Sequence, residues 1–300
     1  MEKETVKGNS SFKFSEKLKD YRLLTKFSLT FMVAFSAVIS YLLAPKIAEY
    51  DWWMMTLLFI GGYLITGSAN TVNQIAEKDT DAQMHRTSNR PVAAGRMSTT
   101  EASIAAVVML VLGLFILWKY FNLLSAIVSL VSWFIYAYMY TPLKKVSAIS
   151  VLVGAVPGAL PCLIGWAAGN DDLGVGGWVL FAIQFFWQFP NFWAIAWVAH
   201  KDYSNAGFKL MPSTEGPTKY SAIQSIIYSL VMIPVGFLPY LVGISGLVSM
   251  GILFIANLFM VWQCVRLYRE MERSAARRVM FSSYFYLPIV LLALLADKIW

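Results

Sequence analysis

The sequence predicts an all-α membrane protein, a polytopic bundle of nine transmembrane helices. Of its residues, 58% are hydrophobic and only 14% are charged, and the mean hydropathy is +0.59. Apolar runs close to the ~20 residues that a spanning helix needs recur along the whole chain. A transmembrane β-barrel would instead alternate apolar and polar residues in segments of about ten. The pattern therefore favours helices over a barrel.

Nine apolar runs are separated by short polar segments. We expect spanning helices at about 25–44, 52–73, 100–118, 121–140, 148–168, 178–199, 221–243, 245–264 and 280–297. Residues 1–24 mix Lys with Glu and Asp and lack the apolar core of a signal peptide, so we expect a cytoplasmic N-terminal segment there. No Pro/Ser-rich linker divides the rest, which predicts one transmembrane domain over 25–300.

The basic residues predict the orientation of the bundle. If the N-terminus faces the cytoplasm, the inner loops hold 21 of the 24 Lys and Arg residues, and the outer side keeps Lys46, Lys119 and Lys298. Lys and Arg concentrate in cytoplasmic loops of membrane proteins. The net charge of +7 therefore describes one membrane face and does not indicate a nucleic-acid partner. A multi-pass protein of a bacterial inner membrane fits this pattern.

The loops indicate a weak internal repeat. Long loops that carry both acids and bases follow the second and sixth predicted helices, at 74–99 and 200–220, and basic loops follow the fourth and eighth. Two four-helix halves with a closing ninth helix would place both acid-bearing loops on one side, facing each other.

Carboxylates at the end of the second predicted helix are the most informative local feature. Asn73, Glu77 and Asp81 recur every four residues, so on a helix they share one face, whereas Asp79 points away. Carboxylates at the edge of a membrane are costly unless they are paired, bind a metal or line a water-filled cavity. Their oxygen ligands suit Mg²⁺, which completes its shell with waters and substrate phosphates.

Basic residues in three inner loops accompany these acids. They are Arg86, Arg90 and Arg96 in the first loop, Lys144 and Lys145 after the fourth helix, and Lys201 beside Asp202 after the sixth. Acids that hold Mg²⁺ and bases that bind phosphate oxygens together match a diphosphate. With an aromatic-rich bundle below, they indicate ionisation of an allylic prenyl diphosphate, in which preorganised cations stabilise the leaving group.

Simpler interpretations stay open for several of these residues. Basic residues next to the membrane commonly serve only as topology signals. His85 and His200 lie in inner loops and are expected to be solvated or hydrogen-bonded, with ligation of a metal as the alternative. We interpret Cys162 and Cys264 as small buried hydrophobic residues. An ion-coupled transporter is a second functional class, but transporters place ion sites near the membrane midplane, and this cluster ends a helix.

Several sequence motifs resemble those of the heme O synthase (protoheme IX farnesyltransferase) family, which is part of the UbiA superfamily of intramembrane prenyltransferases. The motifs occur along this chain in the same order as in the family. The acidic triplet resembles the first aspartate-rich motif of that superfamily. The heme O synthase resemblance is carried by residues 79–91, Tyr140-Thr-Pro-Leu-Lys-Lys145, Gly158 to Pro161 with Gly165 to Ala167, Trp187-Gln-Phe-Pro190, and Asp202 to Gly207 with Met211-Pro212.

The resemblance implies transfer of a farnesyl group from farnesyl diphosphate to the 2-vinyl group of heme b, with water added, giving heme O. It implies a terminal oxidase or a heme A synthase as a downstream partner. A quinone-type aromatic prenyltransferase of the same superfamily is the alternative. By resemblance, Mg²⁺ is held by Asn73, Glu77, Asp81 and Asp202, and the diphosphate by Arg86, Arg90, Lys144 and Lys201. Lys26 and Lys145 are assigned to the heme propionates.

Four positions depart from the family pattern. Glu77 stands where Asp is common, and Lys201 precedes Asp202 where paired acids are usual. Asn191 follows the Trp-Gln-Phe-Pro block where the family usually has His, so a heme-iron ligand cannot be carried over to it. Phe27 replaces the usual Pro after Lys26.

Overall fold

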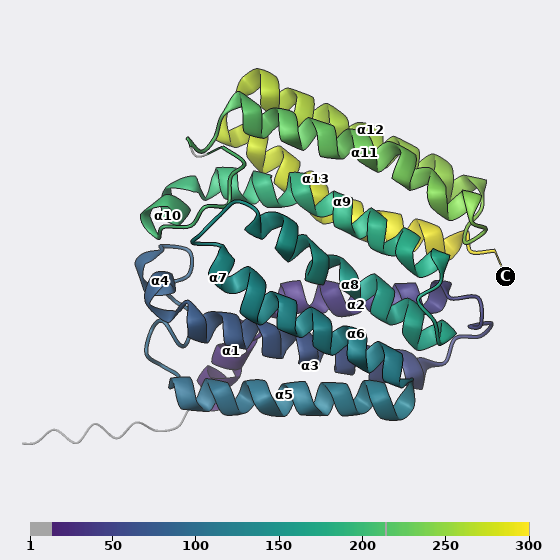
Figure 1. Ribbon diagram of the computed structural model, residues 1–300, viewed down its shortest axis with the longest axis horizontal. Coiled ribbons are helices and arrows are strands. Elements are labelled where there is room, and N and C mark those ends of the chain that lie inside the picture. Colours follow the sequence, from purple (N-terminus) through teal and green to yellow (C-terminus); the bar gives the residue numbers. More distant parts are fainter. Residues whose placement is uncertain (1–13, 214, 300) are drawn as a thin grey trace, which may run out of the picture.

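The computed structural model of the protein describes residues 14–213 and 215–299, and no β-strand occurs among them (Figure 1). Residues 1–13, half of the predicted N-terminal segment, lie outside this range. The helices are α1 (Phe14–Leu24), α2 (Phe27–Leu43), α3 (Trp52–Ala76), α4 (Lys78–Gln83), α5 (Thr99–Tyr120), α6 (Leu123–Phe134), the π-helix η1 (Ile135–Tyr140), α7 (Thr141–Leu143), α8 (Ser150–Asn170), α9 (Val175–Val198), α10 (His200–Asn205), α11 (Lys219–Leu241), α12 (Leu247–Glu270) and α13 (Arg273–Ala296).

Helix length and composition confirm a polytopic membrane bundle. Eight helical segments of the described chain are long and apolar enough to cross a membrane, and α6, η1 and α7 together form one of them. The helices α1 and α2 pass the same test as a pair, although they are bent by 57°. Counting that pair as one span gives nine, the number that the apolar runs predict. The bend falls at Lys26, whose φ of 51° interrupts the helix.

The packing of the helices follows the two halves that the loops predict. In the first half α2 packs on α3, α3 on α5 and α5 on α6; in the second, α8 packs on α9, α9 on α11 and α11 on α12. The halves meet where α2 and α6 contact α8, and α13 packs on α12, α9 and α2. The short helices α4, α7 and α10 lie together at one end of the bundle (Figure 1).

Close packing at the centre depends on small residues, as is typical of membrane helix pairs. A Cβ on Gly165 of α8 would lie 1.9 Å from the carbonyl oxygen of Ala37 in α2. A Cβ on Gly113 of α5 would lie 2.6 Å from the Ile65 side chain of α3. These glycines let the backbones approach, and the first of them joins the two halves.

Candidate active site

The acidic triplet keeps one face although the helix that carries it is interrupted. The shared face was predicted on the premise that residues 73–81 are helical, but α3 ends at Ala76, and Glu77 adopts φ −101° and ψ 11° before α4 begins. The backbone N–H of Glu77 still donates to the Asn73 carbonyl at 3.0 Å, and that of Asp81 to the Glu77 carbonyl at 2.7 Å. Because these four-residue bonds continue across the break, Asn73, Glu77 and Asp81 are all buried, and Asp79 is exposed, as its position on the opposite face predicts.

Two buried ion pairs join these acids to basic residues from other segments. Lys144 Nζ lies 2.5 Å from Glu77 Oε1, and Arg90 Nη1 lies 2.6 Å from Asp81 Oδ2. The Asp81 side chain is 0% exposed. Burial lowers the pKa of Lys144, and the nearby Glu77 carboxylate opposes that shift. The carboxylates therefore face cations inside the protein, and neither points to lipid.

Lys26 joins the same cluster from the break between α1 and α2. Its Nζ donates to Asn73 Oδ1 at 2.8 Å and lies 3.5 Å from the Tyr136 hydroxyl. Asn73 Nδ2 donates to Thr141 Oγ1 at 3.3 Å. The resemblance assigned Lys26 to heme propionates, and the structure places it in contact with the acidic motif. The assignment of Lys26 to the heme propionates stays a prediction.

The second acid-bearing loop folds over the first, as predicted. Arg86 Nη2 donates to the Tyr203 hydroxyl at 2.8 Å, and its guanidinium carbon lies 5.4 Å from the centre of that ring. Burial raises the pKa of Tyr203. The backbone N–H of Lys209 donates to the Lys144 carbonyl at 2.7 Å. These contacts connect the loops after α3, α7 and α9 at one end of the bundle.

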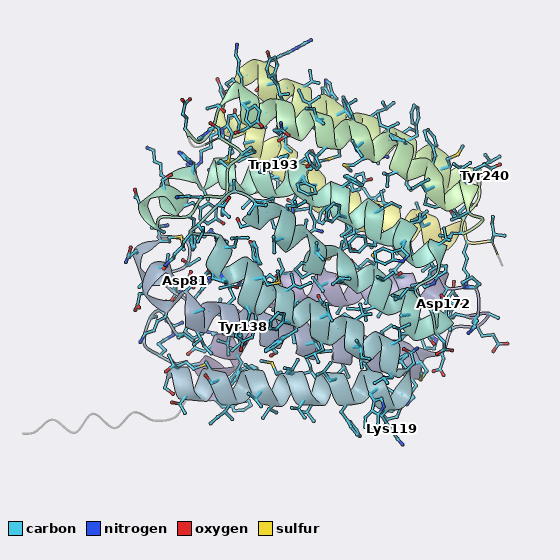
Figure 2. All side chains as sticks on the ribbon, viewed as in Figure 1. Asp81, Lys119, Tyr138, Asp172, Trp193 and Tyr240 are labelled. Carbon is cyan, nitrogen blue, oxygen red and sulfur yellow. The ribbon has the colours of Figure 1, made fainter. Side chains whose placement is uncertain are left out.

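The remaining predicted residues lie at the rim of this cluster. Asp202 is half-buried and Lys201 is exposed, and no ion pair of either occurs within the described ranges. Lys145 is exposed and donates to Thr80 Oγ1 at 2.5 Å. Figure 2 shows Asp81 at the end of the bundle opposite Lys119 and Asp172. The roles of Asp202, Lys201 and Lys145 stay predictions.

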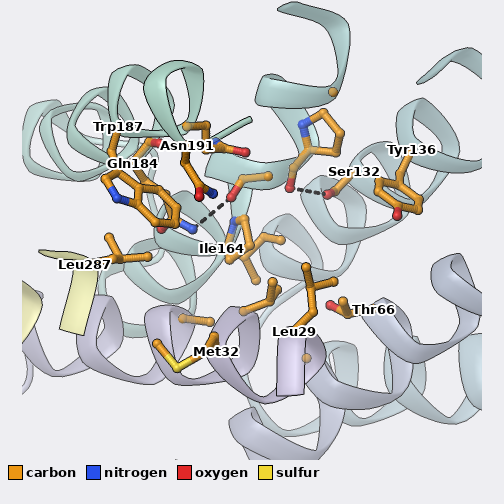
Figure 3. A pocket seen from close by; sticks show the side chains of 18 of the residues that line it. Leu29, Met32, Thr66, Ser132, Tyr136, Ile164, Gln184, Trp187, Asn191 and Leu287 are labelled. Carbon is orange, nitrogen blue, oxygen red and sulfur yellow. Dashed lines mark hydrogen bonds between the residues drawn. The ribbon is translucent and has the colours of Figure 1, made fainter. Parts of the chain in front are cut away.

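A largely apolar cavity of about 650 Å³ lies among the helices, and Tyr136, which contacts Lys26, forms part of its wall (Figure 3). Its wall combines α2, α3, α6, η1, α8, α9 and α13. The lining residues include Leu29, Met32, Ile65, Ser132, Tyr136, Tyr140, Gly154, Pro157, Gly158, Ile164, Gln184, Trp187, Gln188, Asn191 and Leu287. A charged cluster beside such a cavity can bind a diphosphate head while an apolar tail lies in the membrane interior.

The family follows from the sequence itself. Residues 32–287 match the model of the UbiA prenyltransferase family. The chain belongs to this family.

Curated relatives align with nearly the whole chain. A protein from Cytophaga hutchinsonii named protoheme IX farnesyltransferase is 46% identical over 280 residues, covering 93% of this chain and 98% of the relative. A protein of the same name from Flavobacterium johnsoniae is 39% identical over 285 residues, covering 93% and 94%. Both alignments include the two acid-bearing loops.

Solved structures share the fold. A structure described for digeranylgeranylglyceryl phosphate synthase has a TM-score of 0.77 at 20% identity, covering 94% of this chain and 98% of that one. A UbiA homologue from Archaeoglobus fulgidus, bound to GPP and Mg²⁺, has a TM-score of 0.68 at 16% identity, covering 92% and 99%. At these identities the comparison establishes the UbiA-type helical fold.

The acidic cluster offers oxygen ligands that suit a magnesium ion. No group of three or more His, Cys, Asp and Glu side chains converges in the described part of the chain. The oxygens of Asn73, Glu77 and Asp81 are nevertheless the ligands that Mg²⁺ prefers, and phosphates and waters normally supply the rest of its shell. Asp81 Oδ1 is buried and has no hydrogen-bond partner. An orphaned carboxylate oxygen in such a site is a ready ligand.

Sequence reasoning missed Gln184, and it noted Gln188 and Asn191 only by resemblance, without placing them in the cavity. Gln184, Gln188 and Asn191 of α9 line it, and all three are buried. Their spacing of three to four residues on an apolar span was a usable signal, because polar side chains within a membrane face a cavity or a partner. The π-helix η1, which brings Tyr136 and Tyr140 to the cavity wall, has no comparable signature in the sequence.

Proposed function

We propose that this protein transfers a farnesyl group from farnesyl diphosphate to the 2-vinyl group of heme b, with addition of water, giving heme O and diphosphate. The observation that carries this proposal is the sequence identity to proteins named protoheme IX farnesyltransferase, which reaches 46% over 93% of the chain. The buried pairs Glu77–Lys144 and Asp81–Arg90, close to the Lys26–Asn73–Tyr136 contacts at the apolar cavity, supply the matching chemistry.

The cluster can bind a charged leaving group that ordinary membrane interiors exclude. Lys144 and Arg90 already lie within ion-pair distance of the acids, so binding a metal diphosphate requires only an exchange of partners. Asn73, Glu77 and Asp81 would hold Mg²⁺, with Asp202 from the opposite loop. When bound, the ion would neutralise charge on the departing diphosphate. Lys144, Arg90 and the rim residues Arg86 and Lys201 would bind its oxygens.

The cavity residues can protect the allylic cation. Tyr136 and Tyr140 extend from η1 into the lining, and Trp187 of α9 belongs to the same wall. Aromatic faces attract cations electrostatically, and the attraction is strongest where water is excluded. The aromatic wall would therefore keep the farnesyl cation long enough for the vinyl group to attack it.

The positions of the basic loops support a cytoplasmic active site in a bacterial inner membrane. The loops that carry the acids also hold Arg86, Arg90 and Lys201, Lys144 lies in the next inner loop, and this side carries most Lys and Arg residues. The substrate head groups would therefore bind from the cytoplasm. The product would supply a terminal oxidase, directly or after conversion to heme A.

Reconstitution of the purified protein tests the proposal directly. The protein is incubated with heme b, radiolabelled farnesyl diphosphate and Mg²⁺, and the extracted pigment is analysed by mass. The expected product is heme b enlarged by one farnesyl group and one hydroxyl group. Label that remains entirely outside the pigment would refute the proposal. A parallel reaction with an aromatic acid as acceptor distinguishes the quinone-type activity.

A further inference from the structure

Two amide side chains on α9 leave polar atoms directed at the cavity. Gln188 is 4% exposed and Asn191 is 8% exposed, and both line the cavity. They lie three residues apart, so they share one face of the helix. Within the described chain, no hydrogen bond involves Gln188 Oε1 or Asn191 Nδ2. A membrane interior tolerates such atoms only where a partner or water reaches them.

Neighbouring groups fix the direction of the Gln188 amide. Its Nε2 donates to the carbonyl oxygens of Ala155 at 3.0 Å and Gln184 at 3.1 Å. Its Oε1 therefore turns toward Gly158, where an added Cβ would lie 1.9 Å from that oxygen. Glycine at position 158 is thus required for this orientation, which presents a hydrogen-bond acceptor at the cavity wall.

Asn191 presents the complementary donor. Ser283 of α13 donates from Oγ to Asn191 Oδ1 at 2.7 Å, which leaves the Nδ2 hydrogens available to the cavity. Figure 3 shows the Asn191 amide directed into the space between α9 and α2. An acceptor and a donor on adjacent turns give a water molecule the two polar partners that it needs in a buried site.

The depth of this pair suits the reaction. Asn191 lies seven residues before the end of α9, about 10 Å of helix rise, and Asn73 lies three residues before the end of α3, about 5 Å. Measured from these helix ends, Asn191 is about one helical turn deeper than Asn73, and Gln188 about two turns deeper. A carbon two bonds beyond the farnesyl carbon that leaves the diphosphate would come to this level.

We propose that Gln188 and Asn191 hold the water molecule that ends the reaction; this inference rests on the proposed function. The terminal vinyl carbon bonds to carbon 1 of the farnesyl cation, which leaves a cation on the vinyl carbon next to the pyrrole. The water, donating to Gln188 Oε1 and accepting from Asn191 Nδ2, adds its oxygen to that carbon. The proton that it loses passes to the released diphosphate.

The test measures which product forms, because a purely structural role would not change it. The substitutions Asn191→Leu and Gln188→Met keep the side-chain size and remove the polar atoms. Purified proteins react with heme b, farnesyl diphosphate and Mg²⁺ in oxygen-18 water, and mass analysis separates hydroxylated pigment from pigment lighter by one water. We expect each variant to lower the hydroxylated fraction by at least about fivefold, the effect of one lost hydrogen bond.

Matched controls make the outcome decisive. Ser132→Ala removes a cavity hydroxyl that already donates to the Pro157 carbonyl at 3.3 Å, and it should keep the wild-type product ratio. Ser283→Ala removes the hydroxyl that contacts both Asn191 Oδ1 and the Met280 carbonyl oxygen, so it should orient Asn191 less well and give an intermediate ratio, and it serves as the test if Asn191→Leu does not fold. If the Gln188, Asn191 and Ser283 variants all give the wild-type product ratio, the inference is overturned. Absence of any prenylated pigment from the wild-type protein would instead overturn the proposed function.

Discussion

Lys144 Nζ lies 2.5 Å from Glu77 Oε1, and both residues are buried at one end of the bundle. Removing one partner of such a pair leaves an uncompensated charge and costs about 3–5 kcal/mol. Arg90 and Asp81 form a second pair beside it. In the structure, the acids and bases of the site therefore neutralise each other. A ligand with both a cation and an anion can replace both sets of partners.

Asp81→Asn should lower farnesyl transfer by at least about 100-fold, the scale of losing one preorganised electrostatic contact. The substitution removes a negative charge from a side chain that is 0% exposed, and with it the oxygen Oδ1 that has no partner. Steady-state rates at saturating substrates measure the effect. Size-exclusion elution checks that the protein remains folded.

Asp79→Asn is the matched control for this prediction, because Asp79 is two residues away and exposed. It should retain activity within about threefold of wild type, since exposed substitutions away from a site have small effects. Equal damage from both substitutions would show that the acidic face has been assigned wrongly.

Lys144→Arg should extend activity to higher pH. Burial lowers the pKa of Lys144 below the usual 10.5, so the ammonium that we propose binds the diphosphate is lost as the pH rises through that lowered value. Arginine stays charged, because its pKa exceeds about 12. The wild-type kcat/KM for farnesyl diphosphate should therefore fall at high pH, and that of the variant should not. Identical descending limbs would exclude Lys144 as the titrating group.

The helical bundle was predictable because a membrane imposes it. Spans of about 20 apolar residues leave a helix as the only structure that satisfies the backbone. The shared face of Asn73, Glu77 and Asp81 followed from helical periodicity alone and is confirmed by their burial. The break at Glu77 was not predictable, because Asn73, Glu77 and Asp81 keep a regular four-residue spacing across it. The backbone hydrogen bonds that join these three residues follow the same spacing.

The sequence could not predict which side chains pair across the bundle. Nothing in the local pattern pairs Lys144 with Glu77 or brings Lys26 to Asn73, since each pair joins segments far apart in the chain. Lys26 was assigned to the heme propionates by resemblance alone. In the structure its left-handed φ of 51° lets the chain turn between α1 and α2 beside the motif.

Lys26→Met should raise the Mg²⁺ concentration needed for half-maximal activity by about tenfold, the lower end of the effect seen when an outer-shell partner of a metal ligand is removed. Lys26 orients Asn73 through a 2.8 Å hydrogen bond, and methionine cannot donate one. Magnesium titrations at fixed substrate concentrations measure the change. Lys145→Met, at the exposed rim, should leave the magnesium requirement unchanged. If Lys26→Met changes the affinity for heme and leaves the magnesium requirement unchanged, Lys26 binds the heme propionates, as the resemblance implies.

Gly154→Ala should destabilise the protein and reduce transfer, because its Cβ would lie 2.6 Å from ring carbons of Tyr140. Overpacking of this kind typically costs about 1–3 kcal/mol. It would also displace an aromatic ring of the cavity wall, so activity should fall more than stability alone explains. Gly251→Ala, where no atom lies within 4 Å, is the control. Alanine favours helices over glycine by about 1 kcal/mol, so that variant should unfold at the same or a higher temperature in detergent. If Gly154→Ala matches Gly251→Ala in both unfolding temperature and rate, then Tyr140 can move freely and the cavity wall does not depend on its position.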